Sequence, residues 1–391
     1  MLDCRSITRH YPSSLVTPKD AVKTPAKLAS RSCQTSALID DGADLNTLEA
    51  ANFILGLRQK KQENQALKIS ALNCYSEASH NNEIKLCLDR DYFVNDFLPA
   101  VRDAKDSIHL AMFKFSSGVF SSYLINLLID KQQNENIKVR VIMDNCGSGV
   151  MLPRGKSPRP IDLMRKAGIE VVLNQIITKG VEHRKLLIVD GKTAFFGGSC
   201  IADKYFGNDA FWESYHRACK IDGEKNVREA VFNPHNSRSS IGQNQPPFKL
   251  EPQMILPKNH DSALRFKGDS VYQLQTSFLQ SWLYHGRGLD PKSSDQQVRR
   301  RYFPRINPKR VLRQQATSLK ITHSVPWGES EMRHNLLALV NRATQTLDIE
   351  IAYLMVPEVT EALKKAAKRG VKIRLITNSK KSTDTKIAWA A

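Results

Sequence analysis

The sequence lacks the features that mark several large classes of protein. Its seven cysteines are scattered and never form a Cys-x-x-Cys pair, so neither a disulfide framework nor a zinc site is indicated. Apolar runs such as 124–129 are far too short to cross a bilayer. The first residues contain no apolar segment like that of a secretory signal. We therefore expect reduced thiols, a cytoplasmic protein, and membrane contact that is at most peripheral.

Acidic residues are few relative to basic ones. Lys and Arg number 58 against 39 Asp and Glu, a net charge of +19. Such an excess predicts a polyanionic partner: an anionic phospholipid or membrane surface, or nucleic acid. The excess is concentrated in residues 286–313 and 364–386, and it does not decide between lipid and nucleic acid because both are polyanionic. One hypothesis is that Tyr302 and Phe303, beside Arg299–Arg301, dip into a membrane interface.

Alternating helical and strand patterns dominate the chain after Asp91. At 391 residues the chain is long for one domain, so two domains or a duplicated unit is expected. The predicted elements are a helix at 97–105, a strand at 107–113, a helix at 119–130, a strand at 137–143, a helix at 160–167 and a strand at 169–173. Helices of this length between strands predict an α/β fold, with a mixed, largely parallel sheet flanked by helices.

An internal repeat relates two parts of the chain. The pattern Val101-x-x-Ala-x-x-x-Ile-x-Leu-x-Met returns from Val340, and the strand 137–142 returns as 371–376. Any two strand–helix–strand units look somewhat alike, but a Lys-x-Arg at the same place in both strands favours duplication. We expect the second copy to be incomplete.

The repeat suggests a division of the chain into segments. They are a flexible tail (1–45), a helical extension (46–90) with a helix over 48–67, a first half (91–285) containing an insertion (223–266), a basic linker (286–325) and an incomplete second half (326–391).

The segment 181–199 carries the sharpest chemical signal. An apolar run, Asp190-Gly191 and a second apolar run ending in Gly-Gly predict a tight hairpin. Since residues two apart on a strand share a face, His183 and Lys185 should project side by side. An imidazole there can attack phosphorus or move a proton, and an ammonium can neutralise phosphoryl oxygens. Taken singly, these three side chains would be a packed or capping histidine, an edge-strand lysine and an ordinary hairpin aspartate.

The pattern His183-x-Lys185-x4-Asp190-x6-Gly197-Gly198 resembles the HxKxxxxD signature of the phospholipase D superfamily. The resemblance extends over roughly 91–391 and is closest to cardiolipin-synthase-like members. It implies metal-free and cofactor-free displacement at a phosphodiester through a phosphohistidine, giving hydrolysis or phosphatidyl transfer.

The same resemblance assigns roles to individual residues. His183 would be the nucleophile, Lys185 would bind phosphoryl oxygens and Asp190 would hold the motif in shape. The substrate-binding loop would be formed by Gly197, Gly198, Ser199 and Cys200. Asn is usual at the last of these positions, and a thiol is a poor substitute as a hydrogen-bonding group.

A second motif is not found in the sequence. On the spacing of the first copy, a second histidine is expected near position ~417, whereas the sequence stops at Ala391. Three interpretations follow: a shortened lipid-acting enzyme, a catalytic homodimer in which two copies of His183 face each other, or a non-catalytic basic module that binds lipid or nucleic acid. Of these two substrate classes, we favour a lipid over a nucleic acid.

Overall fold

The computed structural model describes residues 78–148, 159–174, 181–235, 248–284, 317–324, 330–354 and 356–377. These residues fall into two compact units that divide between 321 and 322. The predicted tail, the helix over 48–67, the basic stretch 286–313 and the Tyr302–Phe303 hypothesis lie outside the described residues.

The first unit is built on an eight-stranded sheet. In sequence order its strands are β1 (Ser79–Leu88), β2 (Ser107–Met112), β3 (Lys138–Asp144), β4 (Glu170–Asn174), β5 (Lys185–Val189), β6 (Thr193–Gly197), β7 (Ser262–Gly268) and β8 (Thr317–Leu319). Their order in the sheet is β4-β3-β2-β5-β6-β7-β1-β8. Strands β2, β3 and β4 are parallel, and the other pairs are antiparallel. The mixed α/β prediction is confirmed, with more antiparallel pairing than the sequence suggested.

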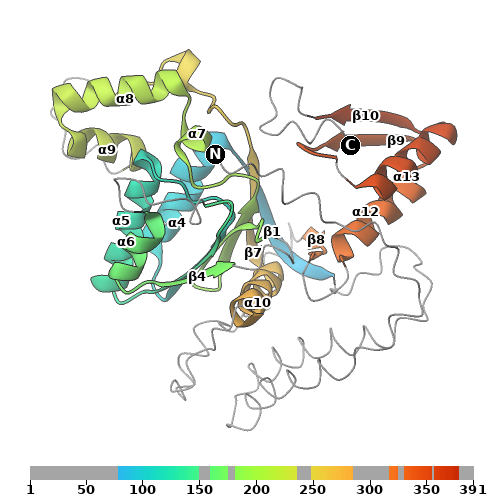
Figure 1. Ribbon diagram of the computed structural model, residues 1–391, viewed down its shortest axis with the longest axis horizontal. Helices are drawn as coiled ribbons and strands as arrows, with labels where there is room; N and C mark the ends of the chain where they lie inside the picture. Colours follow the sequence, from blue (N-terminus) through green and yellow to red (C-terminus); the bar gives the residue numbers. More distant parts are fainter. Residues whose placement is uncertain are drawn as a thin grey trace, which may run out of the picture. The chain divides into compact units, whose positions relative to one another are not determined.

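Helices cover both faces of this sheet (Figure 1). One face carries η5 (Tyr92–Phe97), α4 (Leu98–Asp103), α5 (Val119–Gln133), α6 (Pro160–Lys166), α7 (Asp203–Phe206), α8 (Asp209–Asp222) and α9 (Glu224–Phe232). The other face carries α10 (Asp269–Tyr284). Buried aromatic rings fill the first layer, with Phe93 and Phe120 at a centroid distance of 4.6 Å. Burial of such large apolar side chains is the main driving force for this layer.

Two segments depart from the sequence-based division. Residues 79–88, grouped with the helical extension, form β1, and residues 262–268, at the end of the predicted insertion, form β7. The insertion also contains α9. Strands β1 and β7 pair over seven positions, from Asn82↔Gly268 to Leu88↔Ser262. The paired residues of β1 and β7 are far apart in the sequence, so a local pattern of residues does not reveal the pairing.

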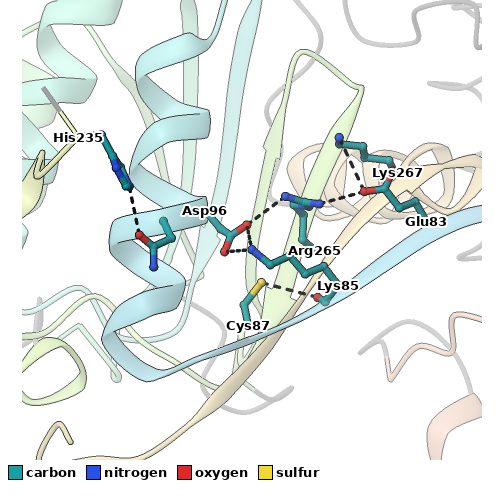
Figure 2. A network of polar contacts seen from close by, with 8 residues as sticks. Glu83, Lys85, Cys87, Asp96, His235, Arg265 and Lys267 are labelled. Carbon is teal, nitrogen blue, oxygen red and sulfur yellow. Dashed lines mark hydrogen bonds and ion pairs between the residues drawn. The ribbon is translucent and has the colours of Figure 1, made fainter. Parts of the chain in front are cut away.

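A buried carboxylate joins η5 to the β1–β7 pair (Figure 2). The Asp96 side chain accepts hydrogen bonds from Lys85 Nζ at 2.8 Å and from Arg265 Nη1 at 3.1 Å. Arg265 also bonds Glu83 at 2.9 Å. Lys85 and Arg265 are directly opposed in the ladder, so the one carboxylate neutralises two cations that would otherwise repel each other. Burial, and next the charge of Asp96, raises the pKa of nearby Cys87 to about 11.

The second unit repeats the first at the level of strand register. Its elements are α12 (Glu331–Arg342), β9 (Thr346–Glu350), α13 (Pro357–Lys368) and β10 (Lys372–Ile376). Strands β9 and β10 are parallel and pair Leu347 with Ile373, as β2 and β3 pair Ile108 with Val139. Both pairs occupy equivalent positions of the sequence repeat, so the duplication is visible in the backbone pairing.

Candidate active site

The predicted hairpin of strands β5 and β6 carries the motif. Its turn places Asp190 at φ 54° and Gly191 at φ 60°, the left-handed pair that a type I′ turn requires. The Asp190 carboxylate accepts hydrogen bonds from the backbone N–H groups of Lys105 (3.1 Å), Asp106 (2.7 Å) and Ser107 (3.0 Å). Asp190 therefore fastens the hairpin turn to the start of β2, at the end of β5 opposite to His183.

His183 and Lys185 lie next to each other at the start of β5. The Lys185 Nζ atom is 3.2 Å from Nδ1 and 3.4 Å from Nε2 of His183, and it donates to the His183 carbonyl at 2.7 Å. The Phe113 ring lies 4.4 Å from the His183 ring, and its centroid is 4.9 Å from Lys185 Nζ. Lys185 is buried, whereas the His183 side chain stays exposed to solvent. The imidazole is thus fixed on one side and accessible on the other.

The electrostatic environment keeps the imidazole neutral. Desolvation by the surrounding protein, followed by the charge of Lys185, lowers the pKa of His183 to about 4. Burial also lowers the pKa of Lys185, and this effect is opposed by nearby Cys200, Asp261, Glu182 and Asp144. At neutral pH His183 therefore has a free nitrogen lone pair, which is the form that a nucleophile needs.

Arg184, between His183 and Lys185 in the sequence, projects from the opposite face of the strand. Arg184 bonds Glu182 through Nε at 2.6 Å, and its Nη1 donates to the Ser277 carbonyl at 3.0 Å and to Ser277 Oγ at 2.8 Å. It also contacts Ser281 on α10. The alternation of a β-strand thus separates the two faces: Arg184 anchors the motif to α10, while His183 and Lys185 face the opposite side.

Asp144, at the end of β3, holds the segment that leads into the motif. Its carboxylate accepts hydrogen bonds from the backbone N–H groups of Glu182 and Gly147, both at 2.8 Å, and from Asn174 Nδ2 at 3.2 Å. Asp144 was not identified from the sequence, although its position as the last residue of a buried strand is a usable signal.

The Gly-Gly loop allows close approach of another strand. A Cβ atom on Gly197 would lie 2.5 Å from the Cα of Ala263, and one on Gly198 would lie 2.0 Å from Oδ1 of Asp261. After the glycines, the side chains of Ser199 and Cys200 are buried. Ser199 Oγ has no hydrogen-bond partner within the described part of the chain. Burial raises the pKa of the Cys200 thiol, and the charge of Lys185 opposes this shift.

Asp261 is a site residue that the sequence did not reveal. Burial raises its pKa, while a hydrogen bond from the Ser262 N–H and the charge of Lys185 lower it. The start of β7 brings this carboxylate against Gly198 and within electrostatic reach of Lys185. The required signal was a long-range strand pairing, which the residues around Asp261 do not encode.

The described residues contain neither a metal-binding cluster nor a membrane-spanning helix. No three His, Cys, Asp or Glu side chains in the described ranges gather in a group that could hold a metal ion. Among the described helices none is both long enough and apolar enough to span a bilayer.

Comparison with known proteins shows which families this chain is similar to. The family model described as "Cardiolipin synthase, PLD-like domain" matches residues 97–215 and 336–391. The chain is 26% identical to cardiolipin synthase 1 of Bacillus cereus over 309 residues, covering 76% of this chain and 50% of that protein. These matches support membership of the phospholipase D superfamily.

Further relatives and solved structures extend the comparison. Cardiolipin synthase of Listeria monocytogenes is 24% identical over 355 residues, covering 84% of this chain and 60% of that protein. The chain thus spans about half to three fifths of the length of these relatives. Among solved structures, phosphatidylserine synthase of Haemophilus influenzae aligns with a TM-score of 0.45 at 13% identity, covering 86% of this chain and 70% of that one. The phospholipase D family member Nuc of Salmonella typhimurium aligns with a TM-score of 0.31 at 14% identity, covering 52% and 93%.

Proposed function

We propose that this cardiolipin-synthase-like chain cleaves or transfers at the phosphodiester of a phospholipid, with His183 as the nucleophile. The observation that carries the proposal is the neutral imidazole of His183 beside the ammonium of Lys185, 3.2 Å from Nδ1. A phospholipid is proposed as the substrate because the relatives that match most of this chain are named cardiolipin synthases.

In the proposed first step, a lone pair of His183 attacks phosphorus and the bond to the leaving alcohol breaks. The leaving oxygen takes up a proton from a general acid. In the superfamily this acid is the histidine of a second motif, which a second copy of the chain or further sequence would supply. Lys185 neutralises charge on the non-bridging oxygens, where a fixed cation is worth most in the transition state. Water or an acceptor alcohol then attacks the phosphohistidine, giving hydrolysis or phosphatidyl transfer.

The other predicted residues have supporting roles in this proposal. Asp190, through its three backbone hydrogen bonds, keeps the hairpin in place. Gly197 and Gly198 leave room for β7 and for Asp261. The Ser199 hydroxyl is buried without a hydrogen-bond partner among the described residues, and we assign it a contact to a phosphoryl oxygen. Cys200 packs into the core of the first unit.

The experiment compares the chain with His183→Ala and with His216→Ala, an exposed histidine on α8 that serves as control. Each protein is incubated separately with phosphatidylglycerol, phosphatidylcholine and single-stranded DNA, and released alcohol or cleaved DNA is measured. We expect lipid turnover that His183→Ala abolishes and His216→Ala leaves intact. A covalent adduct on His183, stable to base and labile to acid, should be trapped from labelled lipid. Metal-independent DNA cleavage without lipid turnover would support a nuclease instead, and no turnover on any substrate would support a binding module.

A further inference from the structure

A histidine–aspartate pair lies at the end of the sheet that carries the motif, and it has no role in the proposed function. The Nδ1 atom of His260 is 2.6 Å from Oδ2 and 2.8 Å from Oδ1 of Asp89. Because a carboxylate only accepts hydrogen bonds, Nδ1 is the donor. The Asp89 side chain is 12% exposed, whereas that of His260 is 63% exposed. The imidazole therefore holds a nearly buried carboxylate from the solvent side.

The backbone at Asp89 turns directly after β1 ends, beside the start of β7 (Figure 1). Its φ is 47°, in the left-handed region that residues with a side chain seldom adopt. The Asp89 carboxylate accepts a hydrogen bond from the backbone N–H of Asp261 at 2.9 Å. In the other direction, the Asp89 N–H donates to the Asp261 carbonyl at 3.0 Å. Two reciprocal hydrogen bonds thus fix the backbone of Asp261.

Strand register places Asp261 on the same face of the sheet as Lys185. If the β5–β6 register is continued by one residue, Lys185 lies opposite Gly197, and Gly197 pairs with Ala263 of β7. Asp261 is two residues before Ala263, so the two share a face. Gly197 has no side chain, so β6 places no side chain between the lysine and β7 in this row. The Asp261 carboxylate also lies against the loop, because a Cβ atom on Gly198 would be 2.0 Å from its Oδ1.

Asp261 supplies negative charge to the buried ammonium of Lys185. Burial lowers the pKa of Lys185, and the two groups that oppose this effect most are Cys200 and then Asp261. Burial raises the pKa of the Cys200 thiol, so that group is uncharged at neutral pH. The largest opposing negative charge is therefore that of Asp261, ahead of Glu182 and Asp144. A carboxylate near a buried ammonium favours its charged form.

We infer that Asp89 and His260 are positioning residues for the phosphate site, because they hold Asp261 where its carboxylate acts on the Lys185 ammonium. The chain of interactions runs from His260 to the Asp89 carboxylate, from Asp89 to the backbone of Asp261, and from Asp261 to Lys185. The inference rests on the proposed function for the role of Lys185. It adds two residues, both outside the motif, that act on this lysine without touching the substrate.

The first test measures Lys185 directly in the full chain. The protein is labelled with ¹⁵N-lysine, its ammonium signals are followed by NMR through a pH titration, and Lys185→Met identifies the signal. In His260→Ala we expect Lys185 to lose its proton at lower pH than in the parent, because a displaced Asp261 no longer opposes the effect of burial. His260→Asn keeps a side-chain N–H near the position of Nδ1 and should titrate as the parent does. His216→Ala, an exposed histidine on α8, is the control and should cause no shift.

A second variant removes the carboxylate and keeps the backbone turn. In Asp89→Gly the residue adopts a φ of 47° without strain, but the bonds to His260 and to the Asp261 N–H are lost. We expect the Lys185 titration to move in the same direction as in His260→Ala. Thermal unfolding is measured in parallel, because a role confined to stability would lower the melting temperature without moving the titration of Lys185.

Turnover of phosphatidylglycerol separates this inference from the proposed function. His260→Ala should lower kcat about tenfold or more with little change in KM, since a displaced cation is lost mainly from the transition state, and His260→Asn should restore it. The inference is overturned if Lys185 titrates in His260→Ala and Asp89→Gly as it does in the parent, or if His260→Asn gives no rescue. If the parent lacks turnover but the Lys185 titration shifts as expected, the proposed function fails while the positioning role stands.

Discussion

At the scale of the residue, the site depends on one lysine that acts on one histidine. Lys185 is buried, and its ammonium lies near both the His183 ring and the Phe113 ring, which also contact each other. The same cation that would bind a phosphoryl oxygen also lowers the pKa of the imidazole. Lys185 therefore supplies the positive phosphate site and adds to the desolvation that keeps the imidazole neutral.

Replacing the lysine should separate these two effects. In Lys185→Met we expect the pKa of His183 to rise from about 4 toward the ordinary value of 6.5, because one of its two lowering causes is removed. An NMR titration of the imidazole protons measures this shift. Lys192→Met, on the turn of the same hairpin and 63% exposed, is the control and should leave the pKa unchanged. An unchanged pKa in Lys185→Met would show that the two side chains are not in contact.

The same shift predicts how stability depends on pH. Between about pH 4 and 6.5 an unfolded histidine binds a proton that folded His183 does not, so the free energy of unfolding rises with pH across this window. The stability that depends on a neutral His183 is fully present above pH 6.5, and it is lost as the pH falls toward 4. We expect His183→Ala to flatten this part of the curve in urea titrations, with His216→Ala as the control. A slope as steep as that of the parent would count against the lowered pKa.

A second residue-scale feature is the carboxylate at the far end of the hairpin. Asp190→Asn keeps a residue that favours the left-handed turn but removes one acceptor oxygen and the charge. We expect the free energy of unfolding to fall by about 1.5–3 kcal/mol, the usual value of hydrogen bonds to charged groups, as measured by urea denaturation. Asp106→Asn is the control, because its side chain is 42% exposed and its ion pair with Lys192 is long, at 3.9 Å. Equal stability of the two variants would contradict the anchoring role of Asp190.

At the scale of the element, the β1–β7 strand pair positions one carboxylate of the site. This pair brings Asp261 against Gly198, and η5 is fastened to it through Asp96 (Figure 2). The position of the site therefore depends on a strand pairing and an ion network that contain none of the motif residues.

Breaking that network should loosen the pairing. In Asp96→Asn, Lys85 and Arg265 lose the carboxylate that neutralises both of them. We expect a loss of about 2 kcal/mol of stability, below the full value for a buried pair because both cations are partly exposed. Hydrogen exchange should quicken for the ladder amides of β1 and β7 and less for those of β2 and β3. Glu83→Gln, which changes the more exposed carboxylate of the network, should have a smaller effect.

At the scale of the whole molecule, the described chain has two compact units with separate cores. Residues such as Leu124 belong to the core of the first unit, and Leu363, Val359 and Ala366 belong to that of the second. The strand register is repeated between the units, but the β9 and β10 strands of the second are far more exposed than β2 and β3.

Separate cores predict separate unfolding transitions. Leu363→Ala should lower the transition temperature of the second unit alone, and Leu124→Ala that of the first alone, each costing about 2–4 kcal/mol. Differential scanning calorimetry with both variants measures this. A single transition that both substitutions shift equally would show that the units unfold together.

Local patterns predicted most of the first unit and the motif. The helices and strands from α4 to β6 lie within a few residues of the predicted ranges because each shows its own periodicity and its own turn signal, as at Asp190-Gly191. The facing of His183 and Lys185 also follows from strand alternation alone, and the structure brings the two side chains together.

Tertiary structure decided what the local pattern does not contain. The places of β1 and β7, the contact of Asp261 with Gly198, and the anchoring of Glu182 by Asp144 all join residues that are distant in sequence. The sequence by itself determined which chemical groups are present and their spacing along one strand. Only the fold decided which carboxylates face them, because strand pairing is set by side-chain packing across the whole sheet and not by the residues next to each partner.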